Sequence, residues 1–425
     1  MKTINCDVVV VGAGPGGSMA AKTCAKYGLD TVLVERKEKP GKPKLFTTSV
    51  NRRIMDYIKI DKKFAVSEVN KYITISAKGI ESDTLESPAA GSTFGYAVNR
   101  KTFEDELAKL AVKEGAELYT KTRATGLIRV DGQIKGIKAK IDEKEGVEIR
   151  SNIVIGADGI ESKVGRWAKI HQAFPKKDLW VMEDFLLEDV DVEEKTIYQW
   201  VRYEKNPGIG FWLSPHEDGK VSLSIFSMQN TLYPTKRGQL FDAFVHFFKN
   251  NPLFSNAKII DRGGGVVPML RLKKFTTDGV MLVGDAASQA EKMYAAGCLH
   301  AMDAGVMAGE MAVEACEEGD FSYNVLSRYE ERWKRLHGED DLVKFYWLRW
   351  LLYASDEQLD VYHQSLKDGG GLHTDEFFEY ISKSSRYMAK LIANFKKEGL
   401  DPLEFASAMM LFRIHFKNYW DTLIQ

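Results

Sequence analysis

The chain has 425 residues, and its 44% hydrophobic and 28% charged content fits a globular protein of two or three domains, which excludes disorder and collagen-like repeats. Its 59 Lys and Arg nearly balance its 60 Asp and Glu, and the net charge of −1 excludes the global positive field of a nucleic-acid-binding protein. Four cysteines without CxxC pairs, a start without a signal-peptide pattern and no apolar run of about 18 residues predict a reduced, cytoplasmic protein without a metal site.

The N-terminal residues predict a βαβ unit. Residues 6–11 (CDVVVV) form a β-branched run that is typical of a strand buried on both faces. A glycine-rich turn over 12–17 and an Ala-rich helical segment over 18–27 follow. Residues 31–34 (TVLV) predict a second buried strand, which ends at Glu35. A parallel sheet commonly begins with this alternation of strand, helix and strand.

The turn of this unit carries the spacing Gly12-x-Gly14-x-x-Gly17. The first glycine makes a tight turn, the second lets the backbone approach a pyrophosphate, and the third lets helix and strand pack closely. The helix that follows offers unpaired N–H groups to phosphates. Because Glu35 ends the second strand, it is placed to accept hydrogen bonds from ribose hydroxyls. Together these features predict a dinucleotide-binding site.

The central part of the chain predicts a change of architecture. A helix is expected over 100–114, a hairpin about Asp131-Gly132 and a buried strand over 152–155. Strand-like runs then dominate from about 180 to 267, with little helix, which indicates an inserted antiparallel sheet.

We therefore expect an α/β fold with three parts. A discontinuous Rossmann-type cofactor-binding domain would span 1–170 and 262–322. An antiparallel β-sheet substrate domain would span 171–261, and a helical, aromatic-rich C-terminal region would span 323–425.

Two later motifs place carboxylates at the ends of buried strands. Asp158 lies in GADG directly after the strand that ends at residue 155, and Asp285 lies in GDAA after the strand over 280–283. A side chain at the carboxyl end of a parallel strand points into the crevice where ligands bind. Asp285 is therefore expected to reach a ribityl or ribose hydroxyl.

Taken in this order, the motifs resemble those of FAD-dependent oxidoreductases of the p-hydroxybenzoate hydroxylase type. The resemblance rests on the glycine turn with Glu35, on the pattern YxVxRxxF over 96–103, and on GADG and GDAA. Within that superfamily, the stretch RGGGVVP over 262–268 and the stretch WLSP over 212–215 resemble the geranylgeranyl reductase family.

The resemblance implies FAD as the cofactor and assigns roles to residues of this sequence. The residues that would bind FAD are Gly12, Gly14, Gly17, Glu35, Arg36, Arg100, Asp158, Gly284, Asp285 and Gly297. The helix after Gly297 would face the flavin pyrimidine edge, where its dipole stabilises negative charge. Trp212 and Pro215 would contact the substrate.

The sequence departs from the family pattern at three places. The loop after GDAA reads QAEKMYAAG over 289–297, without the proline and additional glycines that are common there. The stretch PKLFT over 43–47 has no cysteine. Of the motif aromatic-x-Trp-x-Phe-Pro, only Trp212 and Pro215 remain, with Gly210 and Ser214 in the other two places.

The sequence points less clearly to the reductant and the proton donor than to the cofactor. No second GxGxxG follows a strand, so electrons would come from NAD(P)H docking at the flavin or from a protein carrier such as ferredoxin. The basic stretch over 36–63 is either a docking surface or an ordinary solvated face. Tyr294, Cys298 and His300 lie beside the flavin-facing loop and are the candidate proton donors, although each is also explained as a structural residue.

The segment LVKFYWLRWLLYA over 342–354 is apolar on nearly all sides. This pattern favours a buried helix, and the alternatives are a wall for a long apolar substrate or a peripheral membrane contact. The features together favour an FAD-dependent reductase that saturates C=C bonds of a prenyl lipid by hydride transfer from flavin N5. The alternatives are an FAD-dependent aromatic monooxygenase and a flavoprotein that passes electrons to a quinone or a partner protein.

Overall fold

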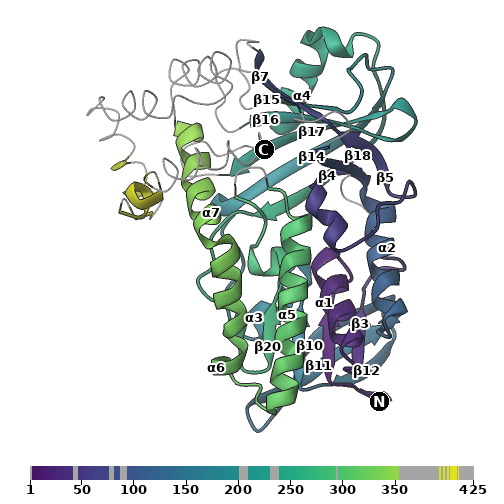
Figure 1. Cartoon of the computed structure of the whole chain (residues 1–425), viewed down its shortest axis with the longest axis vertical. Helices are drawn as coiled ribbons and strands as arrows, with labels where there is room; N and C mark the ends of the chain where they lie inside the picture. Colours follow the sequence, from purple (N-terminus) through teal and green to yellow (C-terminus); the bar gives the residue numbers. More distant parts are fainter. Residues whose placement is uncertain are drawn as a thin grey trace.

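The computed structural model describes residues 2–41, 46–75, 81–86, 93–200, 209–229, 239–292 and 295–353, together with 392–393, 396–397, 400–401, 403–408 and 410. Two sheet-containing parts make up most of it. A parallel sheet with long helices beside it forms the lower half of Figure 1, and a larger sheet with its own helix forms the upper half. This arrangement confirms the expected α/β fold with a Rossmann-type domain.

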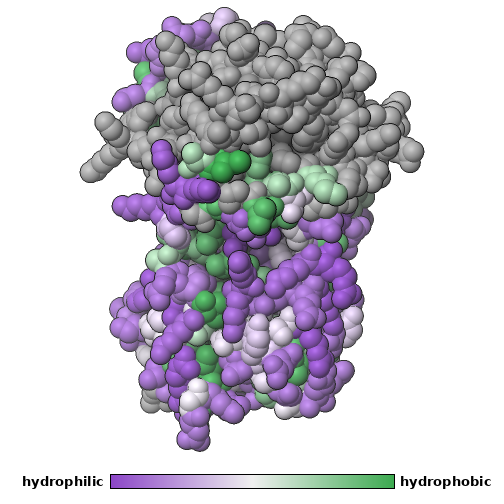
Figure 2. Space-filling view, turned by 90° about the vertical axis from the view of Figure 1, so that its left-hand side faces the viewer, coloured by the Kyte–Doolittle hydropathy of each residue, from purple (hydrophilic) through white to green (hydrophobic). Residues whose placement is uncertain are grey.

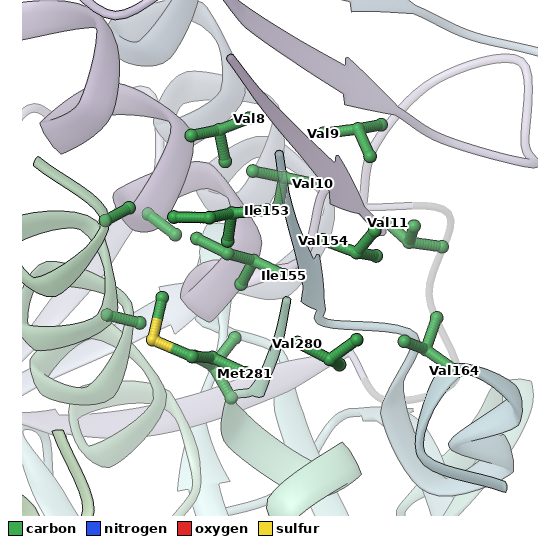
Figure 3. Close-up of a cluster of buried hydrophobic side chains, with 14 of the residues drawn as sticks. Val8, Val9, Val10, Val11, Ile153, Val154, Ile155, Val164, Val280 and Met281 are labelled. Atoms are coloured by element: carbon green, nitrogen blue, oxygen red, sulfur yellow. The ribbon is translucent and has the colours of Figure 1, made fainter. Parts of the chain in front are cut away.

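The lower part is built on a six-stranded sheet. In spatial order its strands are β19 (Thr276–Thr277), β20 (Val280–Leu282), β13 (Ile153–Gly156), β2 (Val8–Val11), β3 (Thr31–Val34) and β9 (Glu117–Tyr119). All of these pairs are parallel except β19 with β20. The central strands are apolar at every position because both of their faces are covered, as Figure 3 shows for β2, β13 and β20.

Three helices pack side by side next to this sheet. They are α1 (Pro15–Lys26), α2 (Arg100–Lys113) and α5 (Cys298–Glu318). In Figure 1, α5 lies between α1 and the later helix α7 (Arg328–Tyr353). A Cβ on Gly305 would stand 2.2 Å from the carbonyl oxygen of Gly16, so glycine permits the close approach of α5 to α1.

A second, smaller sheet packs into the same core. Its order is β1 (Lys2–Asn5), β12 (Glu145–Arg150), β11 (Gln133–Ile141) and β10 (Thr122–Val130). The turn between β10 and β11 is Asp131-Gly132, which confirms the predicted hairpin. The short helix α3 (Lys163–Trp167) follows β13.

The upper part is a seven-stranded sheet. Its order is β18 (Lys258–Pro268), β14 (Leu179–Glu188), β17 (Val221–Gln229), β16 (Ile209–Pro215), β15 (Thr196–Trp200), β6 (Lys71–Ile75) and β7 (Glu81–Glu86). The helix α4 (Gln239–Asn250) covers one face with Phe244 and Phe247. A three-stranded sheet, in the order β4 (Thr47–Asn51), β8 (Gly95–Asn99) and β5 (Ala65–Val69), completes the described strands.

The seven-stranded sheet is wider than the stretch 171–261 expected for it. The strands β6 and β7 come from far earlier in the chain, and β18 continues to Pro268. The pair of β6 with β15 is parallel, so the sheet is mixed rather than wholly antiparallel. This pairing saturates the backbone groups of β15, which would otherwise form an open edge.

After α5 the chain forms α6 (Tyr323–Leu326) and α7 (Arg328–Tyr353), as expected for a helical segment. Val343, Phe345 and Tyr346 of α7 are buried, which favours the buried interpretation of the apolar segment at these positions. Figure 2 shows the side of the molecule that carries α7, where polar side chains dominate the lower half. In the part of the chain that the structure describes, we find no helix with the length and apolar character needed to cross a membrane.

Candidate functional site

The predicted cofactor motifs meet at one edge of the six-stranded sheet. The strands β20, β13, β2 and β3 are consecutive neighbours, and all four run in the same direction. Their carboxyl ends carry the GDAA motif, the GADG motif, the glycine turn and Glu35, respectively. The parallel order of the strands thus brings together residues that are far apart in the chain, from Gly12 in the glycine turn to Asp285 in GDAA.

The glycine turn leaves a backbone cradle at the N-terminus of α1. Gly12 has φ +107°, and a Cβ there would stand 2.3 Å from the carbonyl oxygen of Ala157. A Cβ on Gly17 would stand 1.9 Å from the carbonyl oxygen of Gly12, but a Cβ on Gly14 would meet no described protein atom within 4 Å. No side chain caps the N-terminus of α1, so its N–H groups face this open space. The cradle therefore fits a pyrophosphate.

Glu35 is fixed at the mouth of the cradle. One carboxylate oxygen accepts a hydrogen bond from the backbone N–H of Ala13 at 3.0 Å, and the other accepts one from Lys37 at 2.8 Å. A carboxylate oxygen accepts more than one hydrogen bond, so Glu35 retains capacity for ribose hydroxyls. Arg36, which was expected to contact the cofactor, forms an ion pair with Glu161 at 2.7 Å. This pair joins the end of β3 to the turn after β13.

Asp158 has one satisfied and one unsatisfied oxygen. Its Oδ2 accepts a hydrogen bond from the N–H of Val164 at 3.0 Å, and its buried Oδ1 has no hydrogen-bond partner among the described residues. Burial raises the pKa of this carboxyl group. An unsatisfied buried oxygen at the edge of the cradle is the kind of acceptor that a bound ligand satisfies.

Asp285, Arg100 and Gly297 form the other end of the site. The Oδ1 of Asp285 lies 3.5 Å from the place that a Cβ on Gly297 would take, next to the N-terminus of α5. Arg100 begins α2, and its Nε donates to Glu104 at 2.5 Å. Burial alone would lower the pKa of Arg100, but Cys298, Glu104 and Asp285 together hold the pKa above its ordinary value, so the guanidinium stays charged. Gly284 has φ +64° and donates its N–H to Gln289.

The two candidate proton donors that the structure describes, Cys298 and His300, lie apart. Cys298 is 4% exposed and contacts Thr48, and burial raises the pKa of its thiol, which therefore stays protonated. His300 instead packs between α5 and α7, with its ring centroid 4.5 Å from that of His337. Tyr294 lies outside the described residues.

The seven-stranded sheet presents an apolar cluster to the loop before α5. We call it the sheet cluster, and its members are Trp180, Met182, Phe226, Val267, Met269 and Ala295. Ala295 belongs to the loop that precedes Gly297, so this cluster lies next to the Asp285 end of the site. The ring centroids of Trp180 and Phe226 are 4.7 Å apart. An apolar wall of this kind suits the carbon chain of an apolar substrate.

Sequence reasoning named Trp212 and Pro215 but missed Phe226. Trp212 packs with Tyr72, Val69 and Ile197 and donates its indole N–H to Ser214 at 2.7 Å. Pro215 ends β16, opposite Val221. Gly210 lies opposite Phe226 in the sheet, and a Cβ on Gly210 would stand 2.5 Å from the Phe226 ring. Phe226 thus fills the space above Gly210, where the family motif places an aromatic side chain of its own.

Sequence reasoning also missed Lys292, which has 1% exposure and donates from Nζ to the carbonyl oxygen of Ser288. Burial lowers its pKa to about 8, although the carboxylates of Asp341 and Glu291 oppose this shift. Glu291 pairs in turn with Lys344 of α7 at 3.2 Å. The only signal in the sequence was the departure of the 289–297 loop from the family pattern.

Known proteins resemble this chain over most of its length. A family model described as "FAD binding domain" matches residues 5–251. A digeranylgeranylglycerophospholipid reductase of Methanosarcina acetivorans is 36% identical over 367 residues, which covers 85% of this chain and 88% of the relative. Digeranylgeranylglycerophospholipid reductase 1 of Methanococcoides burtonii is 34% identical and covers 92% of this chain and 94% of the relative.

One solved structure is similar in both fold and sequence. It is that of a geranylgeranyl bacteriochlorophyll reductase-like protein from Thermoplasma acidophilum, with a TM-score of 0.82 and 27% identity. The similarity covers 93% of this chain and 99% of that one.

Proposed function

Because the chain belongs to the FAD-binding family and, within it, to the family of digeranylgeranylglycerophospholipid reductases, we propose that it uses FAD to saturate C=C bonds of a prenyl lipid. The observation that carries the proposal is the sheet cluster, an apolar wall beside the Asp285 end of the cofactor edge. A site for a carbon chain thus lies next to a site for a dinucleotide.

The residues that would hold FAD fit its chemistry. The open cradle at Gly14 and the uncapped N-terminus of α1 suit the pyrophosphate, and Glu35 suits the adenosine ribose. Arg100 and Asp285 suit the ribityl and pyrophosphate region. The N-terminus of α5, at Gly297, would stabilise negative charge on the pyrimidine edge through its dipole.

Bound FAD, once reduced, supplies a hydride to one alkene carbon. The protein must supply the rest: it orients the chain, excludes water and gives a proton to the other carbon. The sheet cluster would orient the prenyl chain and keep water out. Cys298 retains its proton at neutral pH, has Arg100 as a charged neighbour and begins α5 directly after Gly297, so it is our candidate for the group that would protonate the substrate.

The source of electrons and a membrane contact are also part of this proposal. Electrons would arrive from NAD(P)H or from a protein carrier such as ferredoxin, since no second dinucleotide fingerprint occurs in the sequence. A peripheral membrane contact would bring a lipid substrate to the site. Leu403 and Met410, which are 76% and 67% exposed, are the described apolar side chains best suited to it.

The test is an anaerobic half-reaction of the holoenzyme. The flavin is reduced with dithionite, a geranylgeranyl lipid is added, and the flavin absorbance is followed while mass spectrometry measures the lipid. We expect the lipid to reoxidise the flavin and to gain two hydrogens per double bond. A flavin that stays reduced until oxygen is admitted, with hydroxylation of an aromatic compound, would establish the monooxygenase alternative. Rapid reoxidation by a quinone analogue with an unchanged lipid would establish electron transfer alone.

A further inference from the structure

One polar atom of the sheet cluster has no hydrogen-bond partner. Trp180 of β14 is 4% exposed, and its buried indole Nε1 has no partner among the residues that the structure describes. An indole N–H only donates, so only an acceptor can satisfy it. Because most buried side-chain donors in proteins are paired, an exception inside the sheet cluster needs a physical reason. No role assigned above uses this group.

The surroundings of Trp180 supply no acceptor. None of the other side chains of the sheet cluster carries an oxygen or a nitrogen atom, since they belong to Met182, Phe226, Val267, Met269 and Ala295. The strand β14 is paired on both sides, with β17 and with β18, so the adjoining backbone groups belong to the sheet ladders. The Phe226 ring is tilted by 35° to the indole, which is closer to stacking than to the perpendicular geometry in which an N–H points at a ring face.

Another tryptophan of the same sheet does have a partner. Trp212 of β16 donates its indole N–H to the hydroxyl of Ser214 at 2.7 Å. Side chains two positions apart on a strand lie on the same face, so Ser214 is well placed for this bond. The residue two positions after Trp180 is Met182, whose thioether sulfur is only a weak acceptor. The protein therefore satisfies the first indole and leaves the second unsatisfied.

Packing alone does not explain tryptophan at position 180. A phenylalanine ring would also fill apolar space beside Phe226, and it would leave no donor unpaired. A buried donor without a partner lowers the stability of the fold. A ligand that brings an oxygen atom to this N–H would remove that penalty on binding.

Trp180 lies where the apolar wall meets the cofactor edge. Its cluster includes Ala295 of the loop before Gly297, and the Oδ1 of Asp285 lies 3.5 Å from the place that a Cβ on Gly297 would take. The flavin already has proposed partners here, namely the N-terminus of α5 at its pyrimidine edge, and Arg100 and Asp285 at its ribityl region. The polar head of a prenyl lipid has no partner assigned so far.

We propose that the indole N–H of Trp180 binds an oxygen atom at the head of the prenyl chain, in a hydroxyl, ether or ester group. The inference rests on the proposed function and names the part of the substrate that this site recognises. With its head oxygen held at Trp180, the chain would lie along the sheet cluster in a fixed register. The distance of each double bond from the oxygen then decides which bond faces the flavin. Trp180 is thus a specificity-determining residue.

The test combines a change in the protein with a change in the lipid. Trp180→Phe removes the N–H and keeps an aromatic ring. Geranylgeraniol is compared with the hydrocarbon of the same chain that lacks the hydroxyl group. Trp200→Phe is the matched control, because Trp200 packs against Phe247 of α4 on the other face of the same sheet. Each holoenzyme is reduced with dithionite, and kcat/KM for lipid-dependent reoxidation of the flavin is measured.

The ratio of the two lipids carries the result. In the wild type and in Trp200→Phe, we expect kcat/KM for the alcohol to exceed that for the hydrocarbon by about tenfold, because the hydrocarbon leaves the N–H unpaired. In Trp180→Phe the two lipids should differ by less than about twofold. A purely structural role of Trp180 would slow both lipids equally and would leave the ratio unchanged.

A second readout is independent of turnover. In oxidised holoenzyme with 15N-labelled tryptophan, the indole N–H proton of Trp180 should shift downfield with geranylgeraniol and stay in place with the hydrocarbon. A wild-type ratio in Trp180→Phe, or a lost preference in Trp200→Phe, would overturn the assignment. So would a weaker Kd for FAD in Trp180→Phe with equal effects on both lipids, which would place the N–H on the flavin. These outcomes leave the proposed function standing, whereas a wild type that saturates neither lipid would overturn both.

Discussion

At the scale of single residues, Gly14 and Gly17 lie in the same turn but differ in what a side chain would meet. A Cβ on Gly17 would stand 1.9 Å from a carbonyl oxygen of the turn itself, whereas a Cβ on Gly14 would meet no atom of the described residues within 4 Å. The fold therefore requires glycine at position 17, whereas only a bound ligand would require glycine at position 14. Substitution at Gly17 therefore tests stability, and substitution at Gly14 tests cofactor binding.

Gly14→Ala should therefore fold normally and bind FAD more weakly. We expect an unchanged Tm for the apoprotein and an increase of about tenfold or more in the Kd for FAD, because the methyl group occupies the place of the pyrophosphate. Fluorescence titration of the apoprotein with FAD measures the Kd. Gly17→Ala is the matched variant and should lose Tm as well. Unchanged FAD affinity in Gly14→Ala would contradict the assigned cradle.

His300 should make the stability of the protein depend on pH. Its pKa in the fold is about 3, below the ordinary value of 6.5, so the unfolded chain binds a proton more readily in the window between these values. The contribution of neutral His300 is complete above the unfolded pKa and is lost as the pH falls below it. Between pH 7 and about pH 5, the wild type should lose about 2 kcal/mol more unfolding free energy than His300→Gln. Urea unfolding at the two pH values measures this, and parallel losses would refute the assigned environment.

Residue-scale features of the site differ in how far the sequence could predict them. The positions of the glycines, Glu35 and Asp285 at the ends of neighbouring strands were predictable, because they follow from strand ends and spacing along the chain. The packing of Phe226 over Gly210 depends on the register between β16 and β17, and the direction of His300 depends on where α7 lies. Neither of these two features can be predicted from the residues that adjoin it in the sequence.

At the scale of elements, glycines in two helices differ in how much space surrounds them. Gly305 of α5 faces the backbone of α1, and a Cβ there would stand 2.2 Å from the carbonyl oxygen of Gly16. Gly338 of α7 has room, since a Cβ would meet only the Cβ of Lys334, at 3.6 Å. The first glycine serves the contact of two helices, and the second has no such contact.

Substitution by alanine should then act in opposite directions. Gly338→Ala should stabilise the protein by about 0.5–1 kcal/mol, because alanine loses less backbone entropy in a helix. Gly305→Ala should destabilise it by about 1–3 kcal/mol, because α5 must move away from α1. Thermal and urea unfolding measure both effects. A stabilised Gly305→Ala would show that the two helices do not pack as described.

The elements of the lower half were largely predictable, and the edge of the upper sheet was not. The β2, β13 and β20 strands stand out as short, continuous apolar runs because both faces of a parallel sheet are covered. The sequences of β6 and β7 do not indicate which strand they pair with. Their place is decided by the free edge of β15, which lies more than a hundred residues further along the chain.

At the scale of the whole molecule, function depends on the contact between the two halves. The sheet cluster joins strands of the upper sheet to Ala295 in the loop before α5. Neither half alone provides both a dinucleotide cradle and an apolar wall. The expected substrate domain, 171–261, contains Trp180, Met182 and Phe226 of this wall but not Val267, Met269 and Ala295, so the wall emerges only from the assembled sheet and loop.

Phe226→Ala should impair the apolar wall without impairing the dinucleotide cradle. The substitution removes the ring that packs on Trp180, but it leaves the glycine turn, Glu35 and Asp285 in place. We expect an unchanged Kd for FAD and a fall of about tenfold in the rate of lipid-dependent reoxidation, since the apolar wall is opened to water. Phe248→Ala, which changes an aromatic side chain of α4 on the opposite face of the sheet, is the matched control. Loss of FAD from Phe226→Ala, or equal slowing in Phe248→Ala, would contradict this division.

The proposed reaction is the saturation of prenyl double bonds with the flavin as hydride donor. Its most direct test is the mass of the lipid recovered after one anaerobic turnover of the reduced holoenzyme in D2O. Because the hydrogen on reduced flavin N5 exchanges with solvent, we expect a product with two deuterium atoms for each bond saturated. A lipid recovered with its original mass, from a holoenzyme whose flavin is fully reduced, would contradict it.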